Sequence, residues 1–390
     1  MESIVLKIGF VGIRGMVGSV LIERIQEEGD LAQHHPTFFS TSQAGQTITI
    51  QNKAHIYKDA NDISQLEKMD IIVATQGSAY TKNIHPQLRS NNWQGYWLDA
   101  ASHLRMCQDS LIILDPVNHT AIQEGLKTGI KDFIGSNCTV SLMLMSICGL
   151  VNHGLVKAIQ ATTYQAISGA GSKAITELYQ QMAVTSQIAP HQTGLNLANT
   201  IHQTLQKPHA LPQAIIQHPL SMNILPWIDQ AVSQGQSKEE WKAMAETNKI
   251  LRTQTDPIPI DSTCVRTPTL RCHSQSLYLE LNENLPLNKL EDMIASAHPW
   301  VSIVPNTKED TLKELTPIQC ANKLTIKVGR IRKALRSDKH LQLFTTGDQL
   351  LWGAAEPIRR VLPMIIQHIT LTRAKSPVTE STSHCESKEN

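Results

Sequence analysis

The sequence predicts an α/β protein in which a doubly wound parallel sheet precedes an α+β region with a mixed sheet. Three observations lead to this fold class. Short apolar runs alternate with helical periodicity up to about residue 135, and a glycine-rich turn follows the first run. Strand-like runs then follow one another closely after residue 257. The length of 390 residues exceeds one ordinary core, so we expect at least two domains.

In the first half of the chain, strands are expected where short apolar runs end in turn residues. A helix is expected over residues 16–28, and a second helical stretch runs to about residue 89. The alternation is typical of a parallel, Rossmann-like sheet. The expected strands are 4–11, 36–40, 70–74, 95–99 and 111–115.

The second half has a different pattern. Residues 184–220 are rich in Gln, His and Pro, and we expect a loop-rich excursion there. Residues 237–251 are predicted to be helical, with Ser237 as N-cap and Glu240 at the capping-box position. A final amphipathic helix is expected over 349–369, and a disordered polar tail over 373–390. The expected strands are 157–167, 258–265, 270–281, 324–331 and 340–346.

Composition gives no reason to expect a nucleic-acid or membrane partner. Lys plus Arg (35) nearly balances Asp plus Glu (34). No apolar run approaches the ~20 residues that a membrane span needs. The seven cysteines have irregular spacing without a CxxC pair, so neither a metal site nor a disulfide framework is predicted. We expect a reducing, cytoplasmic location.

Glycines recur at every third position from Gly9 to Gly18, between the first expected strand and helix. Glycine allows the backbone to approach a pyrophosphate, and the helix N-terminus attracts its charge. The spacing GxxGxxG differs from the common GxGxxG. The prediction of a dinucleotide site therefore depends on the position of this loop between a strand and a helix. The alternative is a structural turn between strand and helix.

The second expected strand predicts which dinucleotide binds. NAD-binding proteins usually carry an acid about 20 residues beyond the glycine loop, to hold the ribose hydroxyls. Here that strand ends in Ser40-Thr41-Ser42-Gln43, and Arg14 adds positive charge in the loop. Neutral donors beside a cation favour a 2′-phosphate, so NADP is preferred over NAD. The alternative is an ordinary polar turn.

Cys138 precedes the long apolar run 140–150, which predicts a helix with this cysteine at its N-terminus. The unpaired N–H groups there favour a thiolate, which is a competent nucleophile. Cys148 lies inside the same apolar run and is expected in the core. The alternative for Cys138 is also a small buried hydrophobe, the commoner role of cysteine.

Several charged residues are candidate partners of this cysteine. His273 lies near Arg266, and 267–269 is expected to interrupt the strand between them. Glu239 and Lys242 are three residues apart on a predicted helix and share a face. The alternatives are a surface histidine and an exposed ion pair. Arg105 follows a predicted sheet strand, where ligands of α/β proteins bind, although it too could lie on the surface.

Taken together, these segments resemble the aspartate-β-semialdehyde dehydrogenase family, in the form typical of Gram-negative bacteria. The similarity runs from about residue 5 to 370. Matching blocks include Gly15-Met16-Val17-Gly18, Phe38-Phe39-Ser40-Thr41, Asn137-Cys138-Thr139, Glu239-Glu240-Trp241-Lys242, Glu246-Thr247-Asn248-Lys249 and Arg271-Cys272-His273-Ser274. The chain departs from the family at Ile13 in the glycine loop and in segment 168–173. Residues 184–220 align poorly with the family.

The resemblance implies reversible, NADP-dependent conversion of L-aspartyl-4-phosphate to L-aspartate-4-semialdehyde through a cysteine thioester, on the route to lysine, threonine and methionine. It also implies a homodimer. A cofactor domain over 1–136 would be completed by 349–371, and a catalytic and dimerisation domain would cover 137–348.

The resemblance also implies roles for individual residues. Cys138 would be the nucleophile and His273 the acid/base. Gln165, Glu239 and Arg266 would bind the substrate, and Arg105 and Lys242 the phosphate. The implied cofactor site consists of Gly12, Arg14, Gly15, Met16, Val17, Thr41, Ser42, Gln76, Ser168, Gly169 and Gln349.

Two other enzymes share this two-domain plan, and a protein of a different class is a third alternative. N-acetylglutamyl-phosphate reductase has a blocked substrate amine and no use for the Glu239 carboxylate. Glyceraldehyde-3-phosphate dehydrogenase needs a further cationic site. A dinucleotide-binding protein without turnover would not need a nucleophile, a base and both anion-binding groups together.

Overall fold

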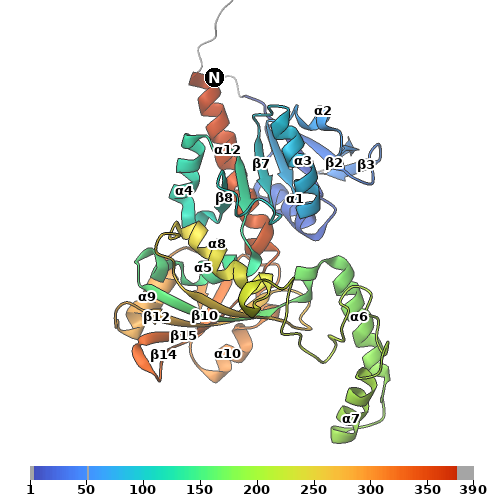
Figure 1. The fold of residues 1–390 in the computed structure, drawn as a ribbon, viewed down its shortest axis with the longest axis vertical. Helices are drawn as coiled ribbons and strands as arrows, with labels where there is room; N and C mark the ends of the chain where they lie inside the picture. Colours follow the sequence, from blue (N-terminus) through green and yellow to red (C-terminus); the bar gives the residue numbers. More distant parts are fainter. Residues whose placement is uncertain (1–3, 51, 376–390) are drawn as a thin grey trace, which may run out of the picture.

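The structure is a computed structural model that describes residues 4–50 and 52–375. Two sheets lie one above the other in Figure 1. The upper sheet is entirely parallel, and the lower sheet is mixed. This arrangement confirms the predicted fold class. A small separate hairpin is formed by β3 (Thr47–Ile50) and β4 (Lys53–Ile56).

The upper sheet has the strand order β5-β2-β1-β6-β7-β9-β8. Because all neighbours are parallel, the carboxyl ends of the strands share one edge, and the segments that follow them meet there. The strands are β1 (Lys7–Val11), β2 (His35–Ser40), β5 (Lys58–Asp59), β6 (Ile71–Ala74), β7 (Tyr96–Asp99), β8 (Ser110–Ile113) and β9 (Asp132–Gly135).

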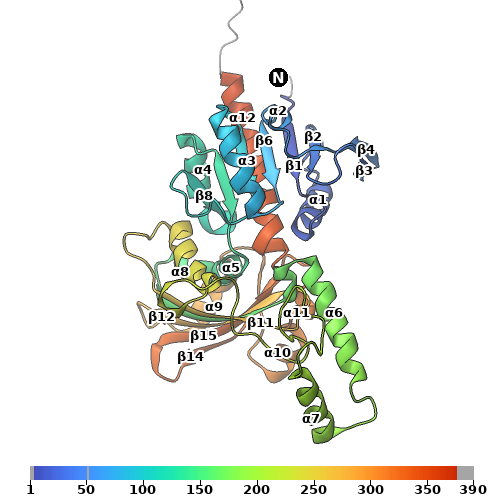
Figure 2. The same cartoon turned by 45° about the vertical axis from the view of Figure 1, so that its right-hand side comes forward.

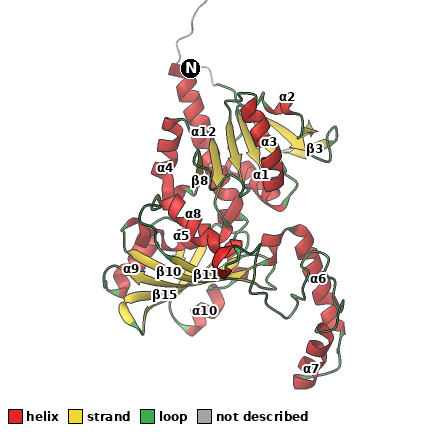
Figure 3. Cartoon of the chain, in the orientation of Figure 1, coloured by secondary structure: helices red, strands yellow, loops and turns green. Residues whose placement is uncertain are grey.

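Helices cover both faces of this sheet (Figure 3). Alternate strand residues enter two separate apolar clusters, as the two-residue period of a strand requires. One face is covered by α1 (Met16–Glu28), α4 (Asp115–Thr128) and α12 (Glu356–Lys375), and the other by α2 (Ile63–Leu66) and α3 (Ser78–Ser90).

The lower sheet has the order β11-β10-β12-β15-β14-β13. The pairs β10–β11 and β13–β14 are parallel, and the other pairs are antiparallel. The strands are β10 (Val156–Gln165), β11 (Ile260–Arg266), β12 (His273–Leu281), β13 (Val301–Ile303), β14 (Ile326–Ala334) and β15 (Ser337–Gly347).

One face of the lower sheet packs against three helices, which with its strands form a large apolar core. These helices are α5 (Cys138–Asn152), α8 (Lys238–Leu251) and α9 (Leu287–Ser296). Two short helices follow β13, namely α10 (Lys308–Glu314) and α11 (Pro317–Cys320). The predicted capping box is present at the start of α8, where Ser237 and Glu240 exchange side-chain and backbone hydrogen bonds.

Two helices, α6 (Ser172–Gln187) and α7 (Gly194–Leu205), form an arm that projects from the lower sheet (Figures 1 and 2). The expectation of a loop-rich excursion over 184–220 was therefore wrong for the end of α6 and for α7. Leu197, Ile201 and Leu205 follow one another every fourth residue, a helical spacing that the polar composition obscured. The remainder, 206–220, is irregular.

The final helix returns to the upper sheet. It starts later than predicted, because a π-helical turn over Leu351–Ala355 separates residue 349 from α12. Residues 373–375 continue α12 and so contradict the expected tail at these three positions, and 376–390 lie outside the described residues. Within the described chain, no helix has the length and apolar character to cross a membrane.

Candidate active site

The site lies where the carboxyl edge of the upper sheet meets one end of the lower sheet. In the upper sheet, Arg105 lies in the segment that follows β7, and Asn137 and Cys138 follow β9. From below, β10 runs parallel to β11 and antiparallel to β12. The last residue of β10, the last residue of β11 and the first residue of β12 therefore share one end of the sheet, and they are Gln165, Arg266 and His273.

Cys138 is the first residue of α5, as predicted. The side chain of Asn137 caps this helix by accepting hydrogen bonds from the N–H groups of Thr139 and Val140. The Sγ atom of Cys138 lies 3.4 Å from Nε2 of His273. This distance places a thiol and an imidazole within hydrogen-bond reach, as a nucleophile and its proton carrier would require.

Both groups are neutral in the free site. Burial, and then the charge of Glu239, raise the pKa of the Cys138 thiol to about 12, against the opposing charges of Arg266, Arg105 and Lys242. Burial, and then the charge of Arg266, lower the pKa of His273 to about 3. The expected thiolate is therefore wrong for the free site, because desolvation outweighs the helix N-terminus and the nearby cations.

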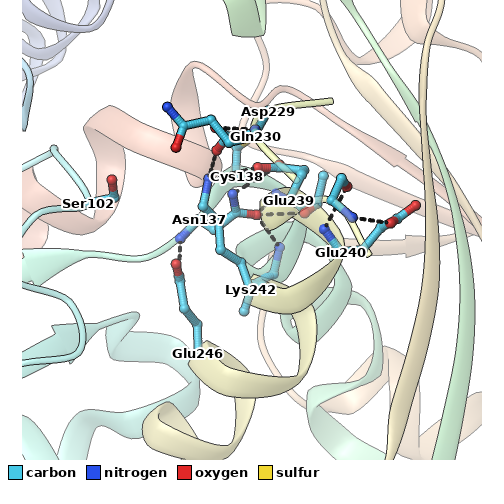
Figure 4. Close-up of polar contacts among 12 residues, drawn as sticks. Ser102, Asn137, Cys138, Asp229, Gln230, Glu239, Glu240, Lys242 and Glu246 are labelled. Carbon is cyan, nitrogen blue, oxygen red and sulfur yellow. Dashed lines mark hydrogen bonds and ion pairs between the residues drawn. The ribbon is translucent and has the colours of Figure 1, made fainter. Parts of the chain in front are cut away.

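Glu239 is the centre of a buried polar network (Figure 4). Its Oε1 accepts hydrogen bonds from the side-chain amides of Asn137 at 3.0 Å and Gln165 at 3.4 Å. Its Oε2 lies 3.0 Å from Nζ of Lys242, which also lies 2.8 Å from the carboxylate of Asp229. The predicted neighbours Glu239 and Lys242 are thus a buried pair, and not an exposed one.

Arg105 is held by a second buried carboxylate. Its Nη1 lies 3.0 Å from Oε1 of Glu246, and its other nitrogens donate to backbone carbonyls that include those of Gly135 and Ser136. The other oxygen of Glu246 accepts the backbone N–H of Asn137 at 2.8 Å. Glu246 therefore links this arginine to the residue before the nucleophile.

Arg266 is buried and donates to the carbonyl of Ala166 at 2.7 Å. Gln349 accepts the backbone N–H of Cys272 at 2.8 Å and donates to the hydroxyl of Ser168. These contacts hold the side chains of Arg266 and Gln349 against the lower sheet.

A cavity of about 660 Å³ connects these residues. His273 does not line the cavity, but its Nε2 atom contacts Sγ of Cys138, which does. The predicted residues that line it are Cys138, Gln165, Glu239, Arg266, Arg105, Lys242, Gly15, Met16, Val17, Ser168, Gly169 and Gln349.

A smaller cavity of about 270 Å³ lies at the ends of β1, β2 and β6. Gly12 has a φ of +82°, and a Cβ there would lie 2.7 Å from the backbone nitrogen of Gln76, so this position requires glycine. Gln76 donates to the hydroxyl of Thr41 at 3.2 Å. The predicted residues that line this cavity are Gly12, Arg14, Gly15, Thr41, Ser42 and Gln76.

The two cavities fit a dinucleotide. The helices α1 and α6 both begin at the larger cavity, and neither N-terminus is capped by a side chain. Their first residues, Met16 and Ser172, lie on its wall, so free backbone N–H groups can receive the pyrophosphate. Gly15 and Thr75 line both cavities, so the two cavities are neighbours.

Comparison with known proteins agrees with this geometry. The model of the semialdehyde dehydrogenase NAD binding domain matches residues 7–125, and that of the semialdehyde dehydrogenase dimerisation domain matches 147–352. The chain belongs to the semialdehyde dehydrogenase family. The resemblance predicted from the sequence is thereby confirmed.

Solved structures of the family extend the comparison. Aspartate semialdehyde dehydrogenase from Francisella tularensis is 48% identical, with a TM-score of 0.89, over 92% of this chain and 99% of that one. Aspartate semialdehyde dehydrogenase II from Vibrio cholerae, complexed with ASA, is 21% identical, with a TM-score of 0.76, over 96% and 100%. The enzyme from Candida albicans, solved with NADP, is 15% identical, with a TM-score of 0.63, over 94% and 99%. The last two show likeness of fold.

In this member of the semialdehyde dehydrogenase family, four residues of the site had no role predicted from the sequence. Asn137 and Asp229 bind the Glu239–Lys242 pair, and Glu246 binds Arg105. Gly353 packs so closely that a Cβ there would lie 2.7 Å from Cβ of Cys138. Glu246 lies in one of the matching sequence blocks, which was a signal for its importance. No local pattern marked Asp229, because its partner lies 13 residues away.

Proposed function

We propose that this protein interconverts L-aspartyl-4-phosphate and L-aspartate-4-semialdehyde with NADP as cofactor. The contact between Cys138 and His273 carries this proposal, because Cys138 lines a cavity together with the buried cations Arg105, Lys242 and Arg266. The identity with the Francisella tularensis enzyme supports the choice of substrate. The carboxylate of Glu239 suits a free ammonium group, which argues against a substrate with a blocked amine.

In the proposed mechanism, the sulfur of Cys138 attacks the acyl phosphate carbon, and the bond from that carbon to the phosphate oxygen breaks. Arg105 and Lys242 hold the departing phosphate, and Arg266 and Glu239 hold the α-carboxylate and ammonium of the substrate. When bound, NADPH supplies a hydride. Nε2 of His273 carries the ring proton, because Nδ1 accepts the N–H of Ala166, so it can donate a hydrogen bond to the substrate oxygen. As the thiohemiacetal anion collapses to the aldehyde, the carbon–sulfur bond breaks and Cys138 leaves as a thiolate.

Burial keeps the thiol protonated in the free site, and it must release this proton to solvent in the cavity before it attacks, because Nε2 of His273 already carries one. Two of the cations that lower its pKa, Arg105 and Lys242, are each paired with buried carboxylates. Binding of the substrate ammonium to Glu239 would neutralise the group that raises the thiol pKa. This contact by itself favours the thiolate, whereas the carboxylate and phosphate of the substrate, held by the three cations that lower the thiol pKa, act in the opposite direction.

The preference for NADP over NAD is part of the proposal. The smaller cavity at the end of β2 contains the donors Arg14, Thr41 and Ser42, and its lining residues include no acid. An acid there would bind ribose hydroxyls and repel a 2′-phosphate. Positive charge and hydroxyl donors instead favour a 2′-phosphate.

We also propose a homodimer that works in the cytoplasm, on the route to lysine, threonine, methionine and isoleucine. The match to a dimerisation domain supports the dimer. On the sheet face opposite α5, Tyr164 packs against Phe344 and is 40% exposed, which suits a contact with a second copy. The proposed domains are 1–136 with 349–371, and 137–348.

The decisive experiment measures NADPH formation from L-aspartate semialdehyde, NADP and phosphate. The Cys138→Ala variant and a reaction without phosphate are run in parallel, with Cys107→Ala as a control at an exposed cysteine. Turnover that requires both phosphate and Cys138 is expected. Turnover in Cys138→Ala would contradict the thioester mechanism, and turnover without phosphate would contradict the assignment of the acyl phosphate.

A further inference from the structure

Tyr57 is a buried residue beside the smaller cavity, and none of the roles described above uses it. It is 3% exposed and belongs to the lining of that cavity. Its hydroxyl oxygen is hidden from solvent and has no hydrogen-bond partner among the described residues. A buried hydroxyl without a partner destabilises the folded protein, so its presence needs an explanation.

The backbone of Tyr57 is held firmly beside the loop that follows β2. Its N–H donates to the carbonyl of Gln46 at 2.9 Å, and its carbonyl accepts the N–H of Gly45 at 2.8 Å. Its ring belongs to the apolar cluster that contains Phe38. Anchored at the backbone and packed at the ring, the side chain has little freedom to find a partner elsewhere.

The groups around the hydroxyl favour an anion. Burial raises the pKa of Tyr57 and the nearby charge of Arg14 opposes the rise, so the phenol stays protonated at neutral pH and can donate. Arg14, Thr41 and Ser42 line the same cavity and are all exposed, so small movements of their side chains give a ligand access to the hydroxyl. No carboxylate is among the lining residues, and every charged group there is positive.

We propose that Tyr57 determines cofactor specificity, with its hydroxyl donating a hydrogen bond to the 2′-phosphate of NADP beside Arg14. This inference rests on the proposed preference for NADP and adds a residue to it. It also explains why an unpaired phenol occupies this position, since the missing hydrogen-bond acceptor arrives with the ligand. A hydrogen bond to a charged group contributes about 1.5–3 kcal/mol, which is roughly tenfold or more in affinity.

The test compares 2′,5′-ADP with 5′-AMP, which differ by the 2′-phosphate, in calorimetric titrations of the full-length protein. Tyr57→Phe removes the hydroxyl and keeps the ring. We expect Tyr57→Phe to bind 2′,5′-ADP about tenfold more weakly and to bind 5′-AMP as the wild type does. Tyr96→Phe is the matched control, because Tyr96 is a buried tyrosine at the amino end of β7, away from both cavities.

Thermal unfolding without ligand provides a second measurement. Since Tyr57→Phe removes an unpaired buried hydroxyl, its melting temperature should equal or exceed that of the wild type. A lower melting temperature, with unchanged selectivity between the two nucleotides, would mean a structural role and would overturn the inference.

The possible failures are distinguishable. If the wild type binds both nucleotides equally, the proposed NADP preference fails, and the inference fails with it. If the wild type prefers 2′,5′-ADP and Tyr57→Phe keeps the full preference, only the role of Tyr57 is refuted.

Discussion

The backbone N–H of Ala166 donates a hydrogen bond to Nδ1 of His273 over 3.1 Å. A nitrogen that accepts a hydrogen bond carries no proton, so the neutral ring bears its proton on Nε2, the atom that faces Cys138. In a charged ring Nδ1 would also carry a proton, so its N–H would point at the N–H of Ala166 and the two donors would repel each other. This contact gives a geometric reason, besides burial and the charge of Arg266, why the ring resists protonation.

The lowered pKa of His273 predicts a pH-dependent stability. The unfolded histidine takes up a proton near pH 6.5, whereas the folded one does so near pH 3. Between these values the unfolded state binds more protons, so the free energy of unfolding falls as the pH falls. From pH 7 to pH 5, this residue should remove about 2 kcal/mol of stability.

Denaturant unfolding of the wild type and His273→Gln at these two pH values measures this contribution. The variant should lose about 2 kcal/mol less than the wild type. His191→Gln, at an exposed position, is the control and should behave as the wild type does. Identical pH dependence in the wild type and His273→Gln would contradict the prediction.

The thiol pKa of Cys138 should respond in opposite directions to two substitutions three residues apart. Glu239 raises this pKa and Lys242 lowers it. At neutral pH, Glu239→Gln should therefore accelerate alkylation of Cys138 by iodoacetamide, and Lys242→Gln should slow it, by about tenfold for each unit of pKa. Mass spectrometry of the Cys138 peptide follows the reaction, and rates that move in the same direction would exclude the electrostatic explanation.

Glu246 should matter for stability and for phosphate binding. It is 2% exposed and accepts both from Arg105 and from the N–H of Asn137. In Glu246→Gln, one amide oxygen cannot replace two charged acceptor oxygens, and Arg105 loses its buried counter-ion. Because a broken buried pair costs about 3–5 kcal/mol, we expect a loss of roughly 3 kcal/mol and a raised KM for phosphate.

Glu124→Gln is the matched control for this substitution. Glu124 pairs with Arg252, and both side chains are about half exposed. Such a pair contributes less than about 1 kcal/mol. Equal losses of stability in Glu246→Gln and Glu124→Gln would show that the buried pair has no special role.

Gly353→Ala should impair turnover through the position of the nucleophile. The added Cβ would lie 2.7 Å from Cβ and 2.9 Å from Cα of Cys138, so the cysteine or the π-helical turn must move. A shift of about 1 Å at a reacting group can cost about a hundredfold in rate. The kcat for NADPH formation from L-aspartate semialdehyde, NADP and phosphate measures the effect.

Gly135→Ala tests whether any added methyl group near the site has this effect. Its nearest neighbour would be Cδ1 of Ile358 at 3.4 Å, an ordinary contact that a flexible side chain accommodates. We expect turnover close to that of the wild type. If both alanine variants were equally active, the close approach of Gly353 to Cys138 would have no importance for catalysis.

Features that depend on local pattern could be predicted from the sequence. Alternating periodicity predicted the parallel sheet, and the polar-to-apolar boundary at Cys138 predicted the start of α5. The spacing of Ser237 and Glu240 predicted the capping box. Each of these depends on residues a few positions apart, because helices, strands and caps are stabilised by short-range hydrogen bonds and by one apolar face.

The protonation states of the site residues and the contacts that hold them in place depend on tertiary packing. Asn137 and Glu246 are 109 residues apart and share a hydrogen bond, and no local pattern encodes that contact. The thiol pKa of Cys138 rises although its position on the helix favours a thiolate, because desolvation depends on how two sheets enclose it. Burial is a property of the whole packed chain. The family resemblance implied many of the residues that line the site, but not how far burial would shift the pKa values of Cys138 and His273.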